Sequence, residues 1–287
     1  MGVTRLVGCR CGPAWPVRSL VEIQDKSLVI TGAGRGIGAA MALRFAHERP
    51  RGVLVADIDE LGAQRVAAQV RSLGVPSIGV RVDVSDREQI IGLVKLAEKE
   101  YDGVDIVCSN AGIATGMGIH AGDADWARSW SINVLAHVHL AQAVLPAMAR
   151  RREGHLMITA SAVGLLGLPG DAPYSVTKHA AVGLAEWLAF TYGGLGVTVS
   201  ALCPMGVRTD LLMAGLEAGH PAARAVADYA PIITAEEVAE AAAQGVADDR
   251  FLILPHPEIA DLYASKAADP QVWVTNQQSA TRPRIKA

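Results

Sequence analysis

The chain has few of the features that mark membrane, secreted or nucleic-acid-binding proteins. Its formal net charge is only −3 over 287 residues, so no general attraction for nucleic acid or anionic lipid is expected. No apolar run approaches the roughly 20 residues that span a bilayer. The only cysteines are Cys9, Cys11, Cys108 and Cys203, which fit no metal-ligand spacing beyond an isolated Cys-x-Cys. We predict a soluble cytoplasmic protein with buried thiols, no metal, and no membrane or nucleic-acid partner.

The first 26 residues also lack something, namely a continuous apolar segment. They contain Arg5, Arg10 and Arg18, but without an apolar centre they do not form a secretory signal. Neither a helical nor a strand period is present. We predict that residues 1–26 are a flexible N-terminal extension outside the fold.

Glycine, in contrast, is concentrated in the segment Leu28 to Gly38, "LVITGAGRGIG", where four glycines fall within seven residues. Glycine in ordered structure costs about 0.5–1 kcal/mol relative to alanine, so the cluster needs a reason. The segment joins an apolar strand pattern to the start of a helical pattern, the setting in which backbone N–H groups bind a pyrophosphate. The spacing is Gly-x-x-x-Gly-x-Gly. The residues predicted to contact a dinucleotide here are Gly32, Gly34, Arg35, Gly36, Ile37 and Gly38.

After residue 27, short apolar runs alternate with longer helical patterns. The strands are expected at 27–31, 52–56, 77–82, 105–108, 155–159, 198–202 and 251–254. The helices are expected at 36–48, 60–73, 86–101, 124–151, 172–193 and 235–247. Strands with few polar residues are typical of a parallel sheet covered on both faces. We predict one α/β domain over 27–257, a doubly wound parallel sheet of about seven strands flanked by helices.

Two segments fall outside this alternation. Residues 205–231 follow the sixth predicted strand and contain glycine, proline and short helical pieces. Because α/β sheets bind ligands beyond the carboxyl ends of their strands, this insertion is a candidate substrate lid. The segment 258–287 ends in polar and basic residues, and we predict a tail whose last ten residues are mobile.

Acidic and amide side chains follow several of the predicted strands. Asp57 ends the second strand, where a carboxylate accepts hydrogen bonds from an adenosine ribose and repels a 2′-phosphate. Arg35 could instead pair with such a phosphate, but no basic residue follows Asp57, so NAD is favoured over NADP. The further residues expected to border the crevice are Asp83, Val84, Asn110, Ala111 and Gly112.

A second group of reactive side chains follows the fifth predicted strand. Ser161 comes first, Tyr174 lies thirteen residues later, and Lys178 is four residues after Tyr174. Residues i and i+4 share a helix face, so the lysine ammonium should lie near the phenol. A free tyrosine has a pKa of about 10, and a nearby cation favours its anion. The pattern therefore predicts a tyrosine that acts as a general base.

Together these pieces resemble the short-chain dehydrogenase/reductase family over most of residues 27–255. The matching segments are Thr31-Gly32-Ala33-Gly34-Arg35-Gly36-Ile37-Gly38, Asp57, Asp83, Asn110-Ala111-Gly112, Asn133, Ser161 and Tyr174-Ser175-Val176-Thr177-Lys178. The resemblance implies a Rossmann-type fold, with Tyr174 as the acid/base and Ser161 holding the substrate oxygen. It further implies that Lys178 binds the nicotinamide ribose and that Asn133 supports a proton-relay water. Asparagine is a poor mid-helix residue, which independently suggests a special role for Asn133.

One segment departs from the family pattern. The family often has Pro-Gly-x-Val-x-Thr after the sixth strand, whereas this chain has Pro204-Met205-Gly206-Val207-Arg208-Thr209. The glycine is displaced by one position, which would bring Met205 near the nicotinamide. The residues that we still expect at the cofactor are Pro204, Gly206, Val207 and Thr209.

These predictions favour an NAD-dependent oxidoreductase that interconverts a secondary alcohol and a ketone. The apolar lid suggests a hydrophobic, steroid-like or long-chain substrate. One alternative is an NADPH-dependent ketoreductase of acyl or carbonyl substrates, which would use Arg35. Another is a non-catalytic nucleotide-binding scaffold. The helix over 174–192 is apolar nearly all round, which predicts a homo-oligomer, a dimer or a tetramer.

Overall fold

Seven strands form one parallel sheet in the computed structural model, which describes residues 22–281. The strands are β1 (Ser27–Thr31), β2 (Gly52–Asp57), β3 (Ser77–Arg81), β4 (Ile106–Ser109), β5 (Gly154–Thr159), β6 (Val197–Leu202) and β7 (Leu252–Ile253). Their order is β3-β2-β1-β4-β5-β6-β7, so the direction of winding reverses between β1 and β4. This is the predicted doubly wound, Rossmann-type sheet.

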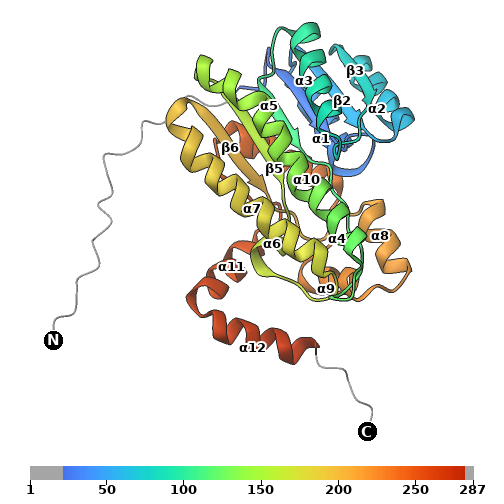
Figure 1. Ribbon diagram of the computed structural model, residues 1–287, viewed down its shortest axis with the longest axis vertical. Helices are drawn as coiled ribbons and strands as arrows, with labels where there is room; N and C mark the ends of the chain where they lie inside the picture. Colours follow the sequence, from blue (N-terminus) through green and yellow to red (C-terminus); the bar gives the residue numbers. More distant parts are fainter. Residues whose placement is uncertain (1–21, 282–287) are drawn as a thin grey trace, which may run out of the picture.

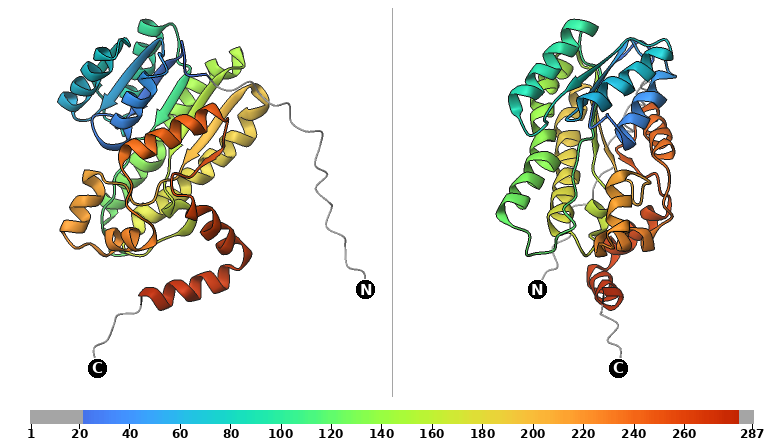
Figure 2. Two further views of the ribbon diagram at one scale, coloured as in Figure 1. Left: turned by 180° about the vertical axis from the view of Figure 1, so that it is seen from behind. Right: turned by 90° about the vertical axis from the view of Figure 1, so that its right-hand side faces the viewer.

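Helices cover both faces of the sheet (Figures 1 and 2). One face packs on α3 (Arg87–Tyr101), α5 (Ala136–Arg151) and α7 (Ala172–Tyr192). The other packs on α1 (Gly36–Ala46), α2 (Glu60–Ser72) and α10 (Ala235–Ala247). All five residues of β1 are buried, which explains why this strand has no alternation of polar residues. The strand β7 is two residues long, shorter than predicted, and pairs only with β6.

The helix predicted over 124–151 is interrupted by one wider turn. It consists of α4 (Asp123–Trp130), a π-helical turn (Ser131–Leu135) and α5. By length and composition the stretch Asp123–Arg151 could cross a membrane, but half of its most apolar window is buried inside the fold. Its packing against α3 and β5 accounts for its apolar side chains.

The segment predicted to be a tail is largely helical. It forms α11 (Glu258–Ala268) and α12 (Pro270–Thr281), which run below the sheet in Figure 1. Lys266 Nζ donates to the Leu165 carbonyl at 2.6 Å, and the Trp273 indole donates to the Leu166 carbonyl at 3.2 Å. These bonds dock the segment onto α6 (Val163–Leu166). Most of the predicted N-terminal extension lies outside the described residues, and of its last five residues Ile23 is buried.

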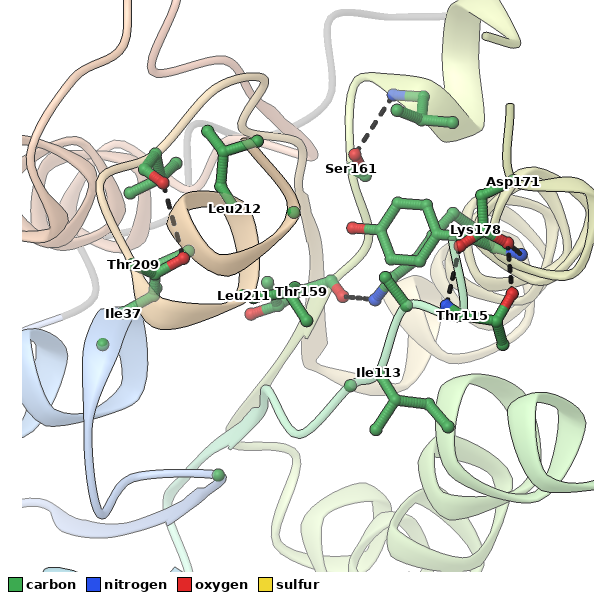
Figure 3. Close-up of a pocket in the computed structure, with 18 of the residues that line it drawn as sticks. Ile37, Ile113, Thr115, Thr159, Ser161, Asp171, Lys178, Thr209, Leu211 and Leu212 are labelled. Atoms are coloured by element: carbon green, nitrogen blue, oxygen red, sulfur yellow. Dashed lines mark hydrogen bonds between the residues drawn. The ribbon is translucent and has the colours of Figure 1, made fainter. Parts of the chain in front are cut away.

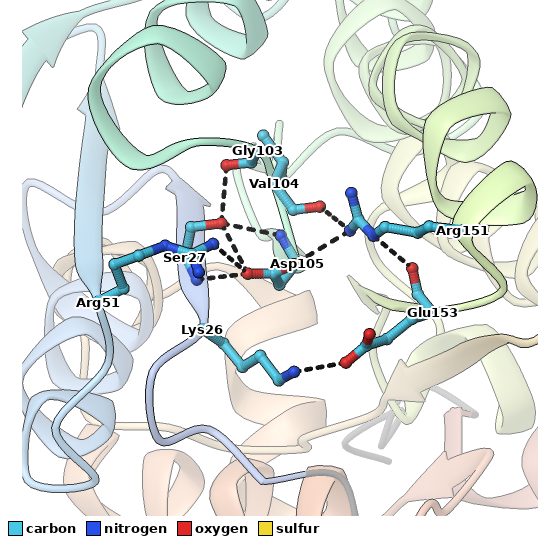
Figure 4. Close-up of polar contacts among 8 residues, drawn as sticks. All are labelled: Lys26, Ser27, Arg51, Gly103, Val104, Asp105, Arg151 and Glu153. Atoms are coloured by element: carbon cyan, nitrogen blue, oxygen red, sulfur yellow. Dashed lines mark hydrogen bonds and ion pairs between the residues drawn. The ribbon is translucent and has the colours of Figure 1, made fainter.

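A polar cluster at the amino ends of β1 and β4 joins the two strands (Figure 4). The Asp105 carboxylate accepts from the Ser27 amide at 2.9 Å and pairs with Arg51 at 2.7 Å and Arg151 at 3.3 Å. Only 14% of its side chain is exposed. The cluster lies at the edge of the sheet where the strands begin.

We expect Asp105→Ala to lower the free energy of unfolding by about 2 kcal/mol, because buried donors lose a charged acceptor. Urea denaturation measures this change. Glu48→Ala serves as the control, since it removes only an exposed partner of Arg44 and should cost about 0.5 kcal/mol. Equal losses in the two variants would contradict a stabilising role for the cluster.

Candidate active site

A cavity of about 900 Å³ lies at the carboxyl ends of the strands, where the winding reverses. Gly32 follows β1, Asp57 ends β2, Asn110 follows β4, Thr159 ends β5 and Pro204 follows β6, and all five line it. Open α/β sheets bind ligands at this place because the two halves of the sheet leave a crevice there. The predicted site residues therefore meet in one space.

Two physical causes explain the glycines of this loop, namely positive φ angles and close contacts with neighbouring backbone. Gly32 and Gly36 have φ of +62° and +57°, which favours glycine. A Cβ on Gly38 would lie 2.3 Å from the Gly32 carbonyl oxygen. Gly34 and Gly38 do not line the cavity, and their contact with a dinucleotide stays a prediction.

The N-terminus of α1 opens on the same cavity. Its N-cap residue, Arg35, makes no side-chain cap hydrogen bond, and the first turn has no acidic residue. Gly36 and Ile37 line the cavity. Backbone N–H groups without a side-chain cap and the positive end of the helix dipole make this terminus suitable for binding a phosphate group.

Asp57 stands at the rim of the cavity and faces the glycine loop. Its Oδ2 accepts from the Gly34 amide at 2.8 Å and its Oδ1 from the Asp59 amide at 2.9 Å. The N-cap residue of α2 is Asp59, so Asp57 does not cap that helix. Arg35 pairs instead with Asp210 at 3.2 Å, at the start of α8 (Asp210–Glu217).

The middle of the cavity is bordered by the loops after β3 and β4. The predicted residues Asp83, Val84, Asn110, Ala111 and Gly112 all line it. The Asn110 side chain donates to the carbonyl of Thr31, the last residue of β1, at 3.0 Å and to the carbonyl of Gly32 at 3.1 Å. This amide therefore joins the two strands at which the winding reverses.

Three of the four predicted catalytic side chains, Ser161, Tyr174 and Lys178, line the same cavity, and Figure 3 shows Ser161 and Lys178 there. The Ser161 hydroxyl lies close enough to the Tyr174 phenol to lower the pKa of that phenol. The Lys178 ammonium lies 5.7 Å from the centroid of the Tyr174 ring and donates to the Thr159 carbonyl at 2.9 Å. Lys178 is 3% exposed. The predicted sharing of one helix face is confirmed.

Burial governs the titration of this group. It raises the pKa of Tyr174 above the usual 10.0, with Ser161 acting in the opposite direction. Burial also lowers the pKa of Lys178 to about 8. The sequence predicts that a nearby cation favours the phenolate. Among this chain's own residues, the loss of solvation has the largest effect on the phenol, and it raises the pKa.

Asn133 lies in the π-helical turn behind the cavity, fully buried. Its Oδ1 accepts from the Ile113 amide at 2.9 Å, and its Nδ2 donates to the Ile113 carbonyl at 2.9 Å and to the Thr177 hydroxyl at 3.0 Å. The side chain thus fixes the loop after β4 against α7. Its part in a proton relay stays a prediction.

The loop after β6 is fixed by hydrogen bonds to the His256 side chain. The His256 Nδ1 accepts from the Met205 amide at 3.2 Å, and the Nε2 donates to the Gly206 carbonyl at 3.2 Å. Pro204, Met205, Val207 and Thr209 line the cavity, whereas Gly206 does not. The place of Gly206 at a cofactor therefore stays a prediction.

Three residues of this site were not predicted: Asp171, Thr159 and His256. Asp171 caps α7 and accepts from the Tyr174 amide at 2.9 Å. An aspartate followed by proline two residues later is a helix-start signal that was present in the sequence. Thr159 acts through its backbone carbonyl and His256 through a long-range contact, so neither leaves a local signal.

The comparison with known proteins decides the family. A family model described as short chain dehydrogenase matches residues 26–218. The chain belongs to the short-chain dehydrogenase/reductase family. The mouse 17-beta-hydroxysteroid dehydrogenase 13 is 33% identical over 236 residues, which is 81% of this chain and 74% of that protein. The 1-deoxy-11-beta-hydroxypentalenate dehydrogenase of Streptomyces exfoliatus is 32% identical over 83% of this chain and 86% of that protein.

Solved structures of the family are similar throughout the fold. A short chain dehydrogenase/reductase from Burkholderia phymatum in complex with NAD is 32% identical, with a TM-score of 0.80 and coverage of 88% of this chain and 96% of that one. A 7-alpha-hydroxysteroid dehydrogenase complexed with NADH and 7-oxo glycochenodeoxycholic acid is 26% identical, with a TM-score of 0.74 and coverage of 82% and 93%. This short-chain dehydrogenase/reductase is thus an NAD(P)-dependent oxidoreductase that interconverts an alcohol and a carbonyl compound.

Proposed function

We propose that this enzyme uses NAD and a hydrophobic secondary alcohol. The observation that carries the proposal is the shared cavity, which has Asp57 at one end and the Ser161–Tyr174–Lys178 group at the other. The uncapped N-terminus of α1 lies between them and suits a pyrophosphate. Gly36, Asp57, Asn110 and Lys178 are the residues that would hold the dinucleotide.

The chemistry of this chain's own residues fits alcohol oxidation. Tyr174 takes the hydroxyl proton of the substrate as general base, and Ser161 donates a hydrogen bond to the same oxygen as its charge develops. Lys178, with its ammonium near the phenol ring, stabilises the tyrosinate. Bound NAD supplies the acceptor for the hydride of the carbinol carbon. In the reverse reaction the Tyr174 phenol returns the proton.

Asp57 supports NAD because its fixed carboxylate would repel a 2′-phosphate. We expect NADH to bind more tightly than NADPH by about tenfold or more, since like charges placed together cost several kcal/mol. In Asp57→Asn this preference should shrink, with Asp59→Asn as the control. Titration by reduced-nicotinamide fluorescence measures the affinities of all three proteins for both cofactors. Stronger NADPH binding by the wild type would instead favour the ketoreductase and a role for Arg35.

The lid supports a hydrophobic substrate. Leu211 and Leu212 of α8 line the cavity, as do Ala223 and Val226 of α9 (Pro221–Tyr229). The names of the relatives refer to hydroxysteroids and a pentalenate, which are polycyclic compounds. Estradiol, a hydroxylated bile acid and 2-propanol, assayed by formation of NADH, test the proposal. Turnover of 2-propanol alone would contradict it.

The outer face of α7 supports assembly with a second copy. Val176, His179, Gly183, Trp187 and Phe190 are exposed at helical spacing, and the two aromatic side chains are 58% and 82% exposed. A largely apolar stripe of this kind can pair with its own copy across a two-fold interface. We propose that pairs of α7 helices join the subunits of a homo-oligomer.

We expect the double variant Trp187→Glu, Phe190→Glu to weaken association by about 30-fold or more, since one interface aromatic often contributes about 2 kcal/mol. Light scattering across a dilution series measures the shift to smaller species. Leu73→Glu, at an exposed apolar position at the end of α2, is the control. A monomeric wild type would contradict the proposed assembly.

A further inference from the structure

The N-cap of α7 is an unusual buried carboxylate. Asp171 is 5% exposed, and its two oxygens accept four hydrogen bonds. Oδ1 accepts from the Tyr174 amide and the Thr115 hydroxyl, both at 2.9 Å. Oδ2 accepts from the amides of Thr115 at 2.7 Å and Gly116 at 2.6 Å. Within residues 22–281 no cationic side chain lies within 4 Å of it.

These bonds join two elements that are far apart in the sequence. One is the first turn of α7, which carries Tyr174, and the other is the loop 113–116 after β4 (Figure 3). The same loop lines the cavity and is fixed at its other end, where Ile113 bonds to Asn133. Two buried polar side chains thus hold both ends of this loop.

We propose that Asp171 is a positioning residue that sets Tyr174 and the substrate-facing loop 113–116 in register with each other. This inference rests on the proposed oxidation by Tyr174. A neutral cap, such as serine, could hold the start of α7 equally well. What it could not supply is a second oxygen that holds two backbone amides of the opposite loop.

The carboxylate also acts on the phenol through space. Four side chains face the Tyr174 phenol or lie near its ring: Ser161, Asp171, Lys178 and Cys203. After burial, which is the largest cause, the charge of Asp171 and the Cys203 thiol raise the pKa of Tyr174 while Ser161 lowers it. Removal of the Asp171 charge should therefore let Tyr174 ionise at a lower pH.

The decisive variants are Asp171→Asn, Asp171→Ser and Thr115→Val. Asp86→Ser is the matched control, because Asp86 caps α3 in the same manner, accepting from the Glu88 amide at 2.9 Å. With estradiol as the substrate, we expect kcat/KM of Asp171→Ser to fall by about 100-fold, as for a misplaced reacting group. Asp86→Ser should keep the wild-type rate, because serine can cap α3 as aspartate does.

Two readouts do not depend on turnover. Tyrosinate absorbance, taken as the difference between each protein and its Tyr174→Phe form, should show Tyr174 titrating at lower pH in Asp171→Asn. Amide hydrogen exchange in residues 113–116 should be faster in Asp171→Ser and Thr115→Val than in the wild type. An unchanged titration together with unchanged exchange would overturn the proposal. A wild type that oxidises no alcohol would contradict the proposed function, while these two readouts still decide the role of Asp171.

Discussion

Tyr174→Phe should lose the oxidation of alcohols almost completely while still binding NADH. The substitution removes one hydroxyl group, and general acid–base catalysis contributes about 10²- to 10⁴-fold to a rate. Ser161 and Lys178 keep their hydrogen bonds to the Pro204 and Thr159 carbonyls, at 3.3 and 2.9 Å. The cavity therefore keeps its shape in this variant. Steady-state rates and a fluorescence titration with NADH measure the two properties.

The pH dependence of the oxidation rate tests the role of Tyr174 in a second way. Because the pKa of Tyr174 is raised above 10.0, only a small fraction is ionised at neutral pH. The rate of oxidation by the wild type should therefore increase as the pH rises toward alkaline values, where more phenolate is present. Reduction, which needs the protonated phenol, should not increase in this way. The residual rate of Tyr174→Phe should lack this dependence.

Tyr101→Phe is the matched control for Tyr174→Phe. Tyr101 is also buried and its pKa is also raised by burial, to about 12, but it lies in α3 against the amino-terminal side of β2. Its loss should leave both turnover and the pH profile unchanged. Turnover by Tyr174→Phe at the wild-type rate would remove the tyrosine from the mechanism.

The sheet could be predicted closely because its signals are local. β1 and α10 have the predicted bounds, since a buried apolar run forms the strand and a Thr234–Glu237 capping box begins the helix. The π-helical turn could not be predicted, because its residues, Ser131–Leu135, include no glycine or proline that would mark an interruption of the helix. The docking of α11 and α12 could not be predicted either, because it depends on hydrogen bonds to carbonyls of α6, about 100 residues earlier in the chain.

The candidate site also has a part that could be predicted from sequence and a part that could not. The residues Asp57, Ser161, Tyr174 and Lys178 line one cavity. Each lies at the carboxyl end of a strand or in the first two turns of a helix at that edge of the sheet. The neighbour of a loop glycine such as Gly34 or Gly38 cannot be identified from sequence. In the structure that neighbour is the protein itself, the Asp57 side chain for Gly34 and the Gly32 carbonyl for Gly38. Gly36 is the loop glycine with positive φ and space on the cavity side.

This difference makes Gly36→Val the sharpest test of phosphate binding. Valine at φ +57° is strained, at a cost of about 1–3 kcal/mol. Its Cβ would lie 3.3 Å from Thr209 Cγ2, on the side of the loop that faces the cavity. We expect affinity for NADH to fall by about 100-fold or more, since the branched side chain would stand where a pyrophosphate approaches the backbone.

The matched control is Gly74→Val at the end of α2. Gly74 has φ +85°, and a Cβ added to it would meet no other atom within 4 Å, so valine there has the same kind of backbone strain in open space. Both variants should lose similar stability in urea, but only Gly36→Val should lose NADH. Retained affinity in Gly36→Val would show that the glycine serves the turn alone. Loss of affinity in both variants would trace the effect to strain, because Gly74 has the positive φ of Gly36 without the cavity beside it.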